Sequence, residues 1–203
     1  MNETSASHPD ADGQIQQRRE GREFILEARQ WLPAEPERVW RFVSDCRHMN
    51  HVIPRFMSFQ ILPADDPAPP RPLAPEVTYE YRLKLHGIAV FWRTRIKEVD
   101  RPRYFRDIQE KGPYARFSHE HRFEPVDGGT LAHDLIRYRP PGGILAPLID
   151  RLYVGPSLRR LFENRHRRMR QLFADDADPS RLFTAATASD LEDHPGGPAS
   201  PDG

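Results

Sequence analysis

The sequence predicts an α+β fold in which a curved antiparallel sheet of seven strands wraps around one long C-terminal helix. Three observations support this prediction: seven strand-like runs are separated by short turns, two short helical stretches follow the first run, and one long amphipathic stretch comes last. Short links favour antiparallel neighbours, and a sheet must bury one face against another element. The last helix is the one long apolar element available for that role, and we expect a cavity between it and the bent sheet.

The first strand is predicted at Arg22–Leu32. There Phe24, Leu26 and Ala28 alternate with charged residues, with the period of two that is typical of a half-buried strand. The other six strands are separated by turn signals rich in Gly, Pro and Asp, which favour a meander. They are predicted at Phe56–Leu62, Glu76–Leu85, Gly87–Val99, Arg103–Lys111, Ala115–Glu124 and Thr130–Arg139.

Helices are predicted in two places. Pro36 stands at a first helical position between the first two strands, and a second short helix near residues 48–53 can be capped by Asp45. The long helix is predicted at Ile144–Phe173, where leucines recur at helical spacing. Its apolar stripe is interrupted at Gly155-Pro156, so we expect a break or kink there.

The folded domain is predicted to span residues 22–173. Residues 1–21 and 174–203 carry few large apolar side chains, so they cannot offset the entropy of ordering and are expected to be disordered acidic tails. The stretch 63–76 holds six prolines in fourteen residues and is expected to be an extended loop. The chain contains no run of apolar residues long enough to span a membrane and no secretory signal, which favours a cytoplasmic location.

The formal net charge of the chain is zero, with 30 basic and 30 acidic residues. The predicted tails hold most of the acidic excess: four acids against two bases in residues 1–21, and seven acids against one base in residues 174–203. Neutrality is therefore a cancellation between a basic domain and acidic ends, and it does not exclude an anionic partner. The single cysteine, Cys46, excludes an internal disulfide and a zinc site made of cysteines.

Several short motifs together point to a family. They are Val39-Trp40-x-Phe42-Val43-x-Asp45, Asn50 with Pro54, Phe105-x-Asp107-x-Gln109-x-x-Gly112-Pro113, His119-x-His121-x-Phe123, Gly129-Thr130, Asp134-x-x-x-Tyr138-x-x-Pro141, and Arg165. On these residues the chain resembles the SRPBCC superfamily, whose START-like helix-grip fold is shared by birch-pollen-allergen proteins, lipid-transfer START domains, coenzyme Q-binding proteins and aromatic polyketide cyclases. It is most similar to a bacterial cyclase/dehydrase-like branch. The resemblance implies the helix-grip fold and a ligand-binding activity, although one fold hosts many functions.

Counting back from a two-residue turn at Asp127-Gly128 places several polar side chains on the inner wall of the sheet. The count pairs His121 with Asp134 and His119 with Ile136. The inner wall then carries Asp107, Gln109, His119, His121, Asp134 and Tyr138. Buried polar groups without partners cost about 1 to 3 kcal/mol each, so these residues must bond one another, water or a ligand.

Four interpretations of this polar wall stay open. It can be a structural network in which Asp134 holds His121, or the polar end of an apolar cavity that fixes a ligand's head group. It can be an acid/base site in which His119, His121 and Asp134 act catalytically. The same three residues can bind a metal, since their spacing suits one face, but the sequence shows no signature of groups that would support such ligands, so no metal and no cofactor is predicted.

Further ligand-binding residues are predicted among inward aromatic positions and on the last helix. Tyr79, Tyr81 and Trp92 join Tyr138 on the inner face, and Arg165 falls on the apolar stripe of the helix, from which it can reach an inner carboxylate or the ligand. We therefore expect a carrier or sensor that binds a lipid, quinone or polyketide-like aromatic molecule. The alternative is an aromatase/cyclase or dehydratase-type enzyme.

The second half of the last helix is crowded with arginines. A solvated surface explains them, and contact with an anionic membrane is the functional alternative. No nucleic-acid partner is predicted.

Overall fold

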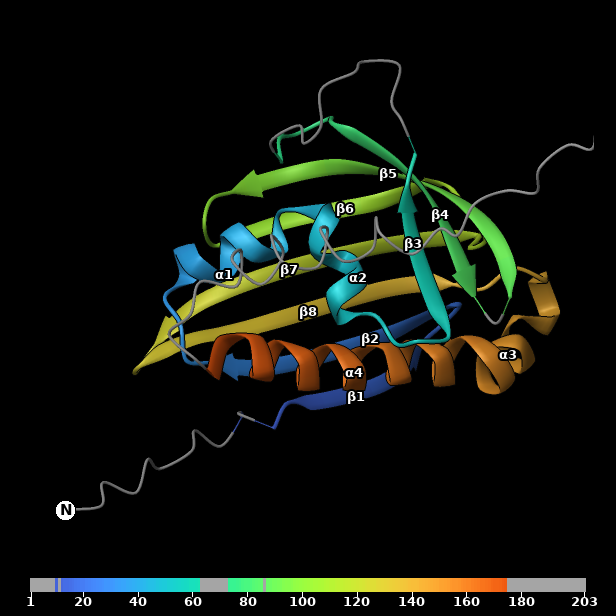
Figure 1. Cartoon of the computed structure of the whole chain (residues 1–203). Coiled ribbons are helices and arrows are strands. Elements are labelled where there is room, and N and C mark those ends of the chain that lie inside the picture. The colour runs from blue at the N-terminus through green and yellow to red at the C-terminus, as the bar shows by residue number, and fades with distance from the viewer. Residues whose placement is uncertain (1–9, 11, 63–72, 86, 175–203) are drawn as a thin grey trace, which may run out of the picture.

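The computed structural model describes residues 10, 12–62, 73–85 and 87–174 of the chain. Its strands form one antiparallel sheet in the order β1-β2-β8-β7-β6-β5-β4-β3, curved around the helices (Figure 1). The strands are β1 (Gln14–Glu20), β2 (Glu23–Leu32), β3 (Met57–Ile61), β4 (Thr78–Leu85), β5 (Ile88–Asp100), β6 (Tyr104–Lys111), β7 (Arg116–Val126) and β8 (Gly129–Arg139). The predicted fold class is confirmed, but the described sheet has eight strands and not seven.

The helical elements lie on one side of the sheet (Figure 1). They are α1 (Pro36–Val43), a 3₁₀ turn (Cys46–His48), α2 (Met49–Val52), a second 3₁₀ turn (Gly143–Leu145), α3 (Ala146–Ile149), a π-helical turn (Asp150–Val154) and α4 (Gly155–Ala174). Asp45 caps the turn before α2 as predicted, because its Oδ1 accepts a hydrogen bond from the Arg47 N–H at 2.9 Å. Among the described helices, none combines the length and the apolar character that crossing a membrane requires.

The predicted break at Gly155-Pro156 takes the form of a π-helical turn. The Gly155 N–H bonds the carbonyl of Asp150, five residues earlier, and α4 continues directly from there. Pro156 has no N–H to donate, and it sits in the first turn of α4, where that loss is least costly. The helix is therefore widened at this point and not interrupted.

Strand β1 lies within the segment predicted to be a disordered tail, so that prediction is wrong for residues 14–20. Its sequence, QIQQRRE, has no apolar alternation because the strand is a sheet edge with largely exposed side chains. Its pairing with β2 runs through the backbone, with Arg18 opposite Ile25. The strand begins after Gly13, whose φ of 81° and closeness to the His166 ring admit no side chain.

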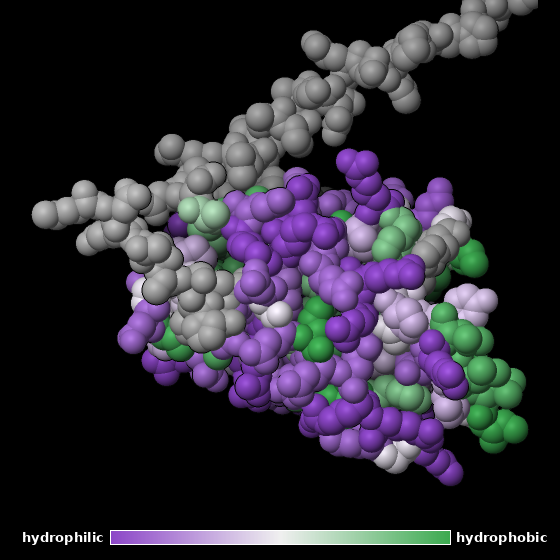
Figure 2. Space-filling model, turned by 90° about the horizontal axis from the view of Figure 1, so that it is seen from below, coloured by the Kyte–Doolittle hydropathy of each residue, from purple (hydrophilic) through white to green (hydrophobic). Residues whose placement is uncertain are grey.

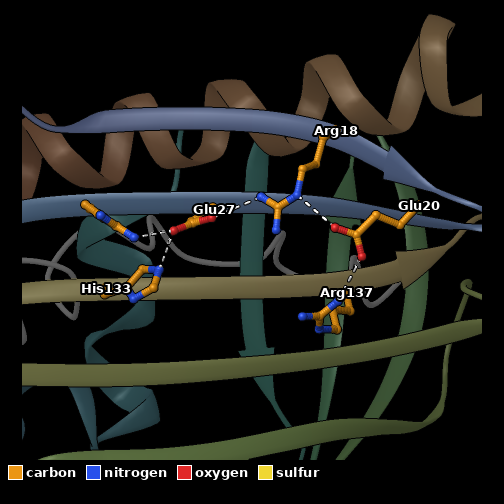
Figure 3. Close-up of polar contacts among 6 residues, drawn as sticks. Arg18, Glu20, Glu27, His133 and Arg137 are labelled. Atoms are coloured by element: carbon orange, nitrogen blue, oxygen red, sulfur yellow. Dashed lines mark hydrogen bonds and ion pairs between the residues drawn. The ribbon is translucent and has the colours of Figure 1, made fainter.

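A polar network on the convex face links β1, β2 and β8 (Figure 3). The carboxylate of Glu27 lies 3.0 Å from Arg18 and 3.1 Å from His133. Arg18 also contacts Glu20, whose other carboxylate oxygen lies 3.6 Å from Arg137. Exposed ion pairs contribute about 0 to 1 kcal/mol each, so this network adds to the backbone pairing of β1 without replacing it.

The concave face holds two apolar clusters. One lies under α1 and the C-terminal half of α4, where Trp40, Phe105, Phe123 and Phe173 meet. The other lies under the first half of α4 and gathers Phe24, Leu26, Ala28, Trp92, Phe117, Ile136, Tyr138, Leu158 and Phe162. Four polar residues of the inner wall, Asp107, His119, His121 and Asp134, lie between these clusters and face α4.

Candidate functional site

Four polar residues of the sheet and one of α4 form a buried network on the concave face. Asp107 comes from β6, His119 and His121 from β7, and Asp134 from β8. The register pairs Asp107 with His119 and His121 with Asp134, as the sequence predicted for the second pair. Alternation of side chains along each strand turns all four toward α4, from which Arg165 reaches them.

One carboxylate oxygen joins most of this network. Oδ1 of Asp134 lies 2.9 Å from Nε2 of His119, 2.8 Å from Nδ1 of His121 and 3.5 Å from Nη2 of Arg165. The second nitrogen of His121, Nε2, lies 3.3 Å from Oδ2 of Asp107. His121 and Asp134 are each only 6 % exposed. Asp134 is therefore the hub of the network, and His121 bridges the two carboxylates.

The two histidines differ in their acid–base character. Burial, together with the adjacent His121, lowers the pKa of His119. Burial acts the same way on His121, but hydrogen bonds to Asp107 and Asp134 outweigh it and raise the pKa of His121. Burial alone would raise the pKa of Asp134, yet Arg165 and the imidazoles hold it well below its usual value. At neutral pH the network thus pairs a carboxylate with a neutral His119 beside a more basic His121.

Aromatic rings enclose the histidines. The ring centroids of His119 and His121 are 3.7 Å apart, and Phe105 stacks on His121 at 3.9 Å. Phe162 of α4 approaches His119 edge-on at 6.0 Å. Such a shell lowers the local dielectric and strengthens the charge interactions inside it.

A small cavity connects this region to α2. Its volume is about 20 Å³, room for about one water molecule, and Arg165 belongs to both the cavity and the network. The other lining residues are Phe42, Val43, Asp45, His48, Met49, Val52 and Met169, most of them apolar. Two bonds hold α2 over α4: Asn164 donates to the Val52 carbonyl at 2.8 Å, and Arg168 to the His51 carbonyl at 3.2 Å.

A larger polar groove of about 370 Å³ lies on the other side of α2, between β3 and α4. Arg55, Arg167 and Arg168 line it together with Asn50, Ile53, Pro54, Met57, Ser58, Asn164 and Gln171. Its lining includes three arginines and no carboxylate. An apolar molecule would not be favoured there, whereas a small anion would.

Two predicted ligand-binding residues hold the backbone or a neighbouring element and do not join the network. The Gln109 amide donates to the Tyr114 carbonyl at 2.8 Å and accepts the Tyr114 N–H at 3.2 Å, which fixes the turn after β6. Tyr138 is 1 % exposed and donates to Asp150 of the π-helical turn at 2.7 Å. Both side chains point inward as predicted, but each is satisfied by the protein itself.

Two of the predicted aromatic residues, Tyr81 and Trp92, meet at a buried threonine. Thr94 Oγ1 lies 3.0 Å from the Tyr81 hydroxyl and accepts the Trp92 Nε1–H at 3.0 Å. Tyr79 is opposite Thr94 in the strand register. Burial is the main cause that raises the pKa of Tyr81 well above its usual value, and the charge of Asp107 adds to it. Sequence reasoning missed Thr94. The signal was available, because Thr94 is two residues after Trp92 on β5 and therefore lies on the same inner face.

Three residues of the network also form a set that could hold a metal ion. Asp107, His119 and His121 each offer one ligand atom within 4.8 Å of the others. Two imidazoles and a carboxylate suit Zn²⁺. From the sequence, Asp134 was the expected carboxylate ligand. In the structure, Asp107 groups with the two histidines, and Asp134 does not belong to this set. A metal there would have to displace the proton that His121 shares with Asp107.

Comparison with known proteins places this geometry in context. A family model described as polyketide cyclase / dehydrase and lipid transport matches residues 32–167. No curated protein sequence matches the chain. Among similar solved structures, a Rhodobacter sphaeroides protein has a TM-score of 0.58 and 15% identity, with 79% of this chain and 98% of that one covered.

Two further solved structures have similar folds. An Arthrobacter aurescens protein has a TM-score of 0.56 and 11% identity, covering 77% of this chain and 90% of that one. A Mycobacterium smegmatis protein has a TM-score of 0.54 and 15% identity, covering 75% and 93%. At such identities the likeness concerns the fold alone.

Proposed function

Because the chain belongs to the polyketide cyclase / dehydrase and lipid transport family, we propose that it binds a hydrophobic small molecule between the sheet and α4, as a carrier or sensor. The observation that carries this proposal is the buried network of Asp134, the two histidines and Arg165, placed between two apolar clusters. A polar head group has partners in the network, while an apolar body has partners on either side. Lipids, quinones and polyketide-like aromatic molecules share this chemistry.

Entry of such a ligand requires α2 to move. The cavity at Arg165 holds about 20 Å³, far less than any of these ligands needs. Helix α2 has only four residues, and the hydrogen bonds from Asn164 and Arg168 are among the contacts that hold it to α4. Lifting α2 would join the cavity to the polar groove on its other side. We infer that α2 is the element that opens.

Mass spectrometry under native conditions tests the proposal. The full chain, purified without detergent, should carry a bound molecule, and thermal shifts should identify its class in a panel of a fatty acid, a phospholipid, ubiquinone and an aromatic polyketide. Arg165→Met should weaken binding of the best ligand by about tenfold or more, the effect of losing one charge-assisted hydrogen bond. Arg160→Met, an exposed residue of the same helix that lines neither the cavity nor the groove, is the matched control. An empty protein that no panel member stabilises would contradict the proposal.

A second candidate function is supported by the opposed pKa shifts of the histidine pair. A neutral His119 can accept a proton next to a carbonyl, while a protonated His121 can donate one to a leaving hydroxyl, as an aromatase/cyclase or dehydratase requires. Asp134 would orient both rings.

The enzyme candidate is tested by turnover of a poly-β-keto thioester. His121→Ala and Asp134→Asn should abolish turnover while circular dichroism shows an intact fold. If the wild-type protein binds a ligand but does not turn over the thioester, the enzyme function is contradicted and the carrier function stands.

A further inference from the structure

Large apolar side chains that are exposed to solvent gather at one end of the molecule. Ile144 is 95% exposed and Tyr153 70%, and Leu145, Leu148 and Leu152 are each more than half exposed. All five lie on the segment between β8 and α4. Figure 2 shows hydrophobic side chains clustered at this end, and the turn between β4 and β5 lies at the same end in Figure 1. Ile88, the first residue of β5, is also exposed. We call residues 144–153 the apolar tip.

The backbone of the tip is held in place, so its exposure is not the fraying of a loose end. Gly142 and Gly143 have φ values of 95° and 56°, which turn the chain outward from β8 into the tip. Ala146 is buried, and Asp150 accepts the hydrogen bond of Tyr138. The inner side of the segment is therefore anchored while its leucines face solvent. Exposed apolar groups of this size mark interaction sites.

Basic residues flank the tip. Arg151 lies within it, and Arg159 and Arg160 follow in the first turns of α4, all exposed. Two acidic residues lie close by: Asp150, whose carboxylate accepts the hydrogen bond of Tyr138, and Glu163, which pairs with Arg159 at 3.1 Å. Arg151 and Arg160 are the cations on which the preference for an anionic surface rests. Exposed apolar side chains gathered at one end of the molecule, with cations beside them, match the boundary between acyl chains and anionic headgroups.

We propose that the apolar tip inserts into the headgroup region of an anionic lipid bilayer and docks the protein there through Ile144, Leu148 and Leu152. This position differs from the one predicted from the sequence, which was the arginine-rich second half of the last helix. In the structure Arg165 faces Asp134, Arg168 bonds the His51 carbonyl, and Arg170 pairs with Asp12. The inference concerns where the protein docks and does not depend on which molecule it carries.

Co-sedimentation of the full chain with vesicles tests the docking. Vesicles of phosphatidylcholine with phosphatidylglycerol should bind the protein, and pure phosphatidylcholine vesicles should bind it more weakly. Ile144→Ser and Leu152→Ser should each reduce binding by about tenfold, the effect of withholding one large apolar side chain from lipid. Arg151→Gln with Arg160→Gln should remove the preference for anionic vesicles. Val126→Ser and Arg103→Gln, at turns remote from the tip, are the matched controls.

A direct probe separates insertion from other associations. A nitrobenzoxadiazole label on Ile144→Cys, in a Cys46→Ser background, should brighten and shift to the blue with anionic vesicles. The proposal is overturned if the wild-type protein does not bind vesicles. It is also overturned if ultracentrifugation shows a dimer and Ile144→Ser dissociates that dimer. Ligand binding measured in solution should be unchanged in Ile144→Ser, so failure of the docking and failure of the proposed carrier function give different results.

Discussion

Asp134 shows how one residue can organise a buried site. Its Oδ1 faces two imidazoles and a guanidinium. Removing any one of these partners would leave the buried carboxylate with fewer groups to offset its charge. A buried network of this kind does not necessarily add stability over an apolar core, but breaking it is costly. The residue therefore fixes the positions of His119 and His121, whichever ligand or reaction they serve.

Asp134→Asn should lower the stability of the fold by about 3 to 5 kcal/mol, because it leaves Arg165 without its carboxylate and His121 with Asp107 alone. It should also lower the pKa of His121, which two carboxylates now raise. Urea denaturation and NMR titration of the histidine ring protons measure the two effects. Glu27→Gln, which removes a carboxylate from the convex face, should cost less than 1 kcal/mol. Equal losses in the two variants would contradict a special role for the buried network.

His166 predicts how stability depends on pH. Burial is the main cause that lowers its pKa to about 4; Asp134 opposes this shift, and the cations of Arg165 and Arg170 add to it. Between this value and the unfolded value near 6.5 the unfolded chain binds the extra proton, so stability should fall as the pH drops through this window. The difference corresponds to about 3 kcal/mol. His166→Gln should flatten thermal stability between pH 6.5 and 4, and an unchanged pH profile would contradict this assignment.

The sequence predicted which residues face inward far better than it predicted their partners. Counting from the Asp127-Gly128 turn placed His121 opposite Asp134 correctly, because a two-residue hairpin fixes the register of both strands. Arg165 was predicted to reach an inner carboxylate from its place on the apolar stripe, and it does. Alternation could not show that Gln109 bonds a backbone turn or that Tyr138 bonds Asp150, since such partners depend on how distant loops return to the sheet.

At the scale of elements, the π-helical turn before α4 is the junction between the sheet and the helix. Tyr138 reaches it from β8, and its hydrogen bond to Asp150 joins the apolar tip to the sheet. Burial raises the pKa of Asp150, in part offset by that hydrogen bond. The phenol of Tyr138 thus anchors the tip together with the buried Ala146.

Tyr138→Phe should destabilise the protein by about 1 to 2 kcal/mol, because it removes one hydrogen bond and leaves a half-buried carboxylate with a lost partner. Hydrogen exchange should speed up in residues 150–154 more than in β8. Asp150→Asn should restore part of the loss in the double variant, since a neutral amide is cheaper to bury than a carboxylate. Uniform acceleration across the chain would mean that the bond has no local role.

Strand β1 is the element that sequence reasoning could not find. Amphipathic patterning detects strands that bury one face, as in Glu23–Leu32, whereas an edge strand held by backbone hydrogen bonds leaves no such pattern. The strands that the sequence did predict all carry inward apolar residues, and this is why their pattern could be detected. The predicted loop 63–76 lies mostly outside the described residues.

At the scale of the whole molecule, the charge is divided between a basic body and acidic ends. The stretch 175–203 holds seven acids and one base. Deleting it should therefore increase binding to vesicles that contain phosphatidylglycerol, and the increase should shrink between low salt and 0.5 M salt because the interaction is screened. Vesicle co-sedimentation at several salt concentrations measures this. Identical binding by the full and shortened chains would show that these acids do not oppose docking.

An open sheet has two edges, and each could recruit further chains into fibres. At the β3 edge, the Asn50 amide donates to the Phe59 carbonyl at 2.8 Å and accepts the Phe59 N–H at 3.0 Å, so a side chain takes the place of a neighbouring strand. At the other edge, the arginines of β1 would repel a second copy laid alongside. Asn50→Leu should thus leave the fold intact and make the protein prone to aggregation through β3, which turbidity on heating would reveal.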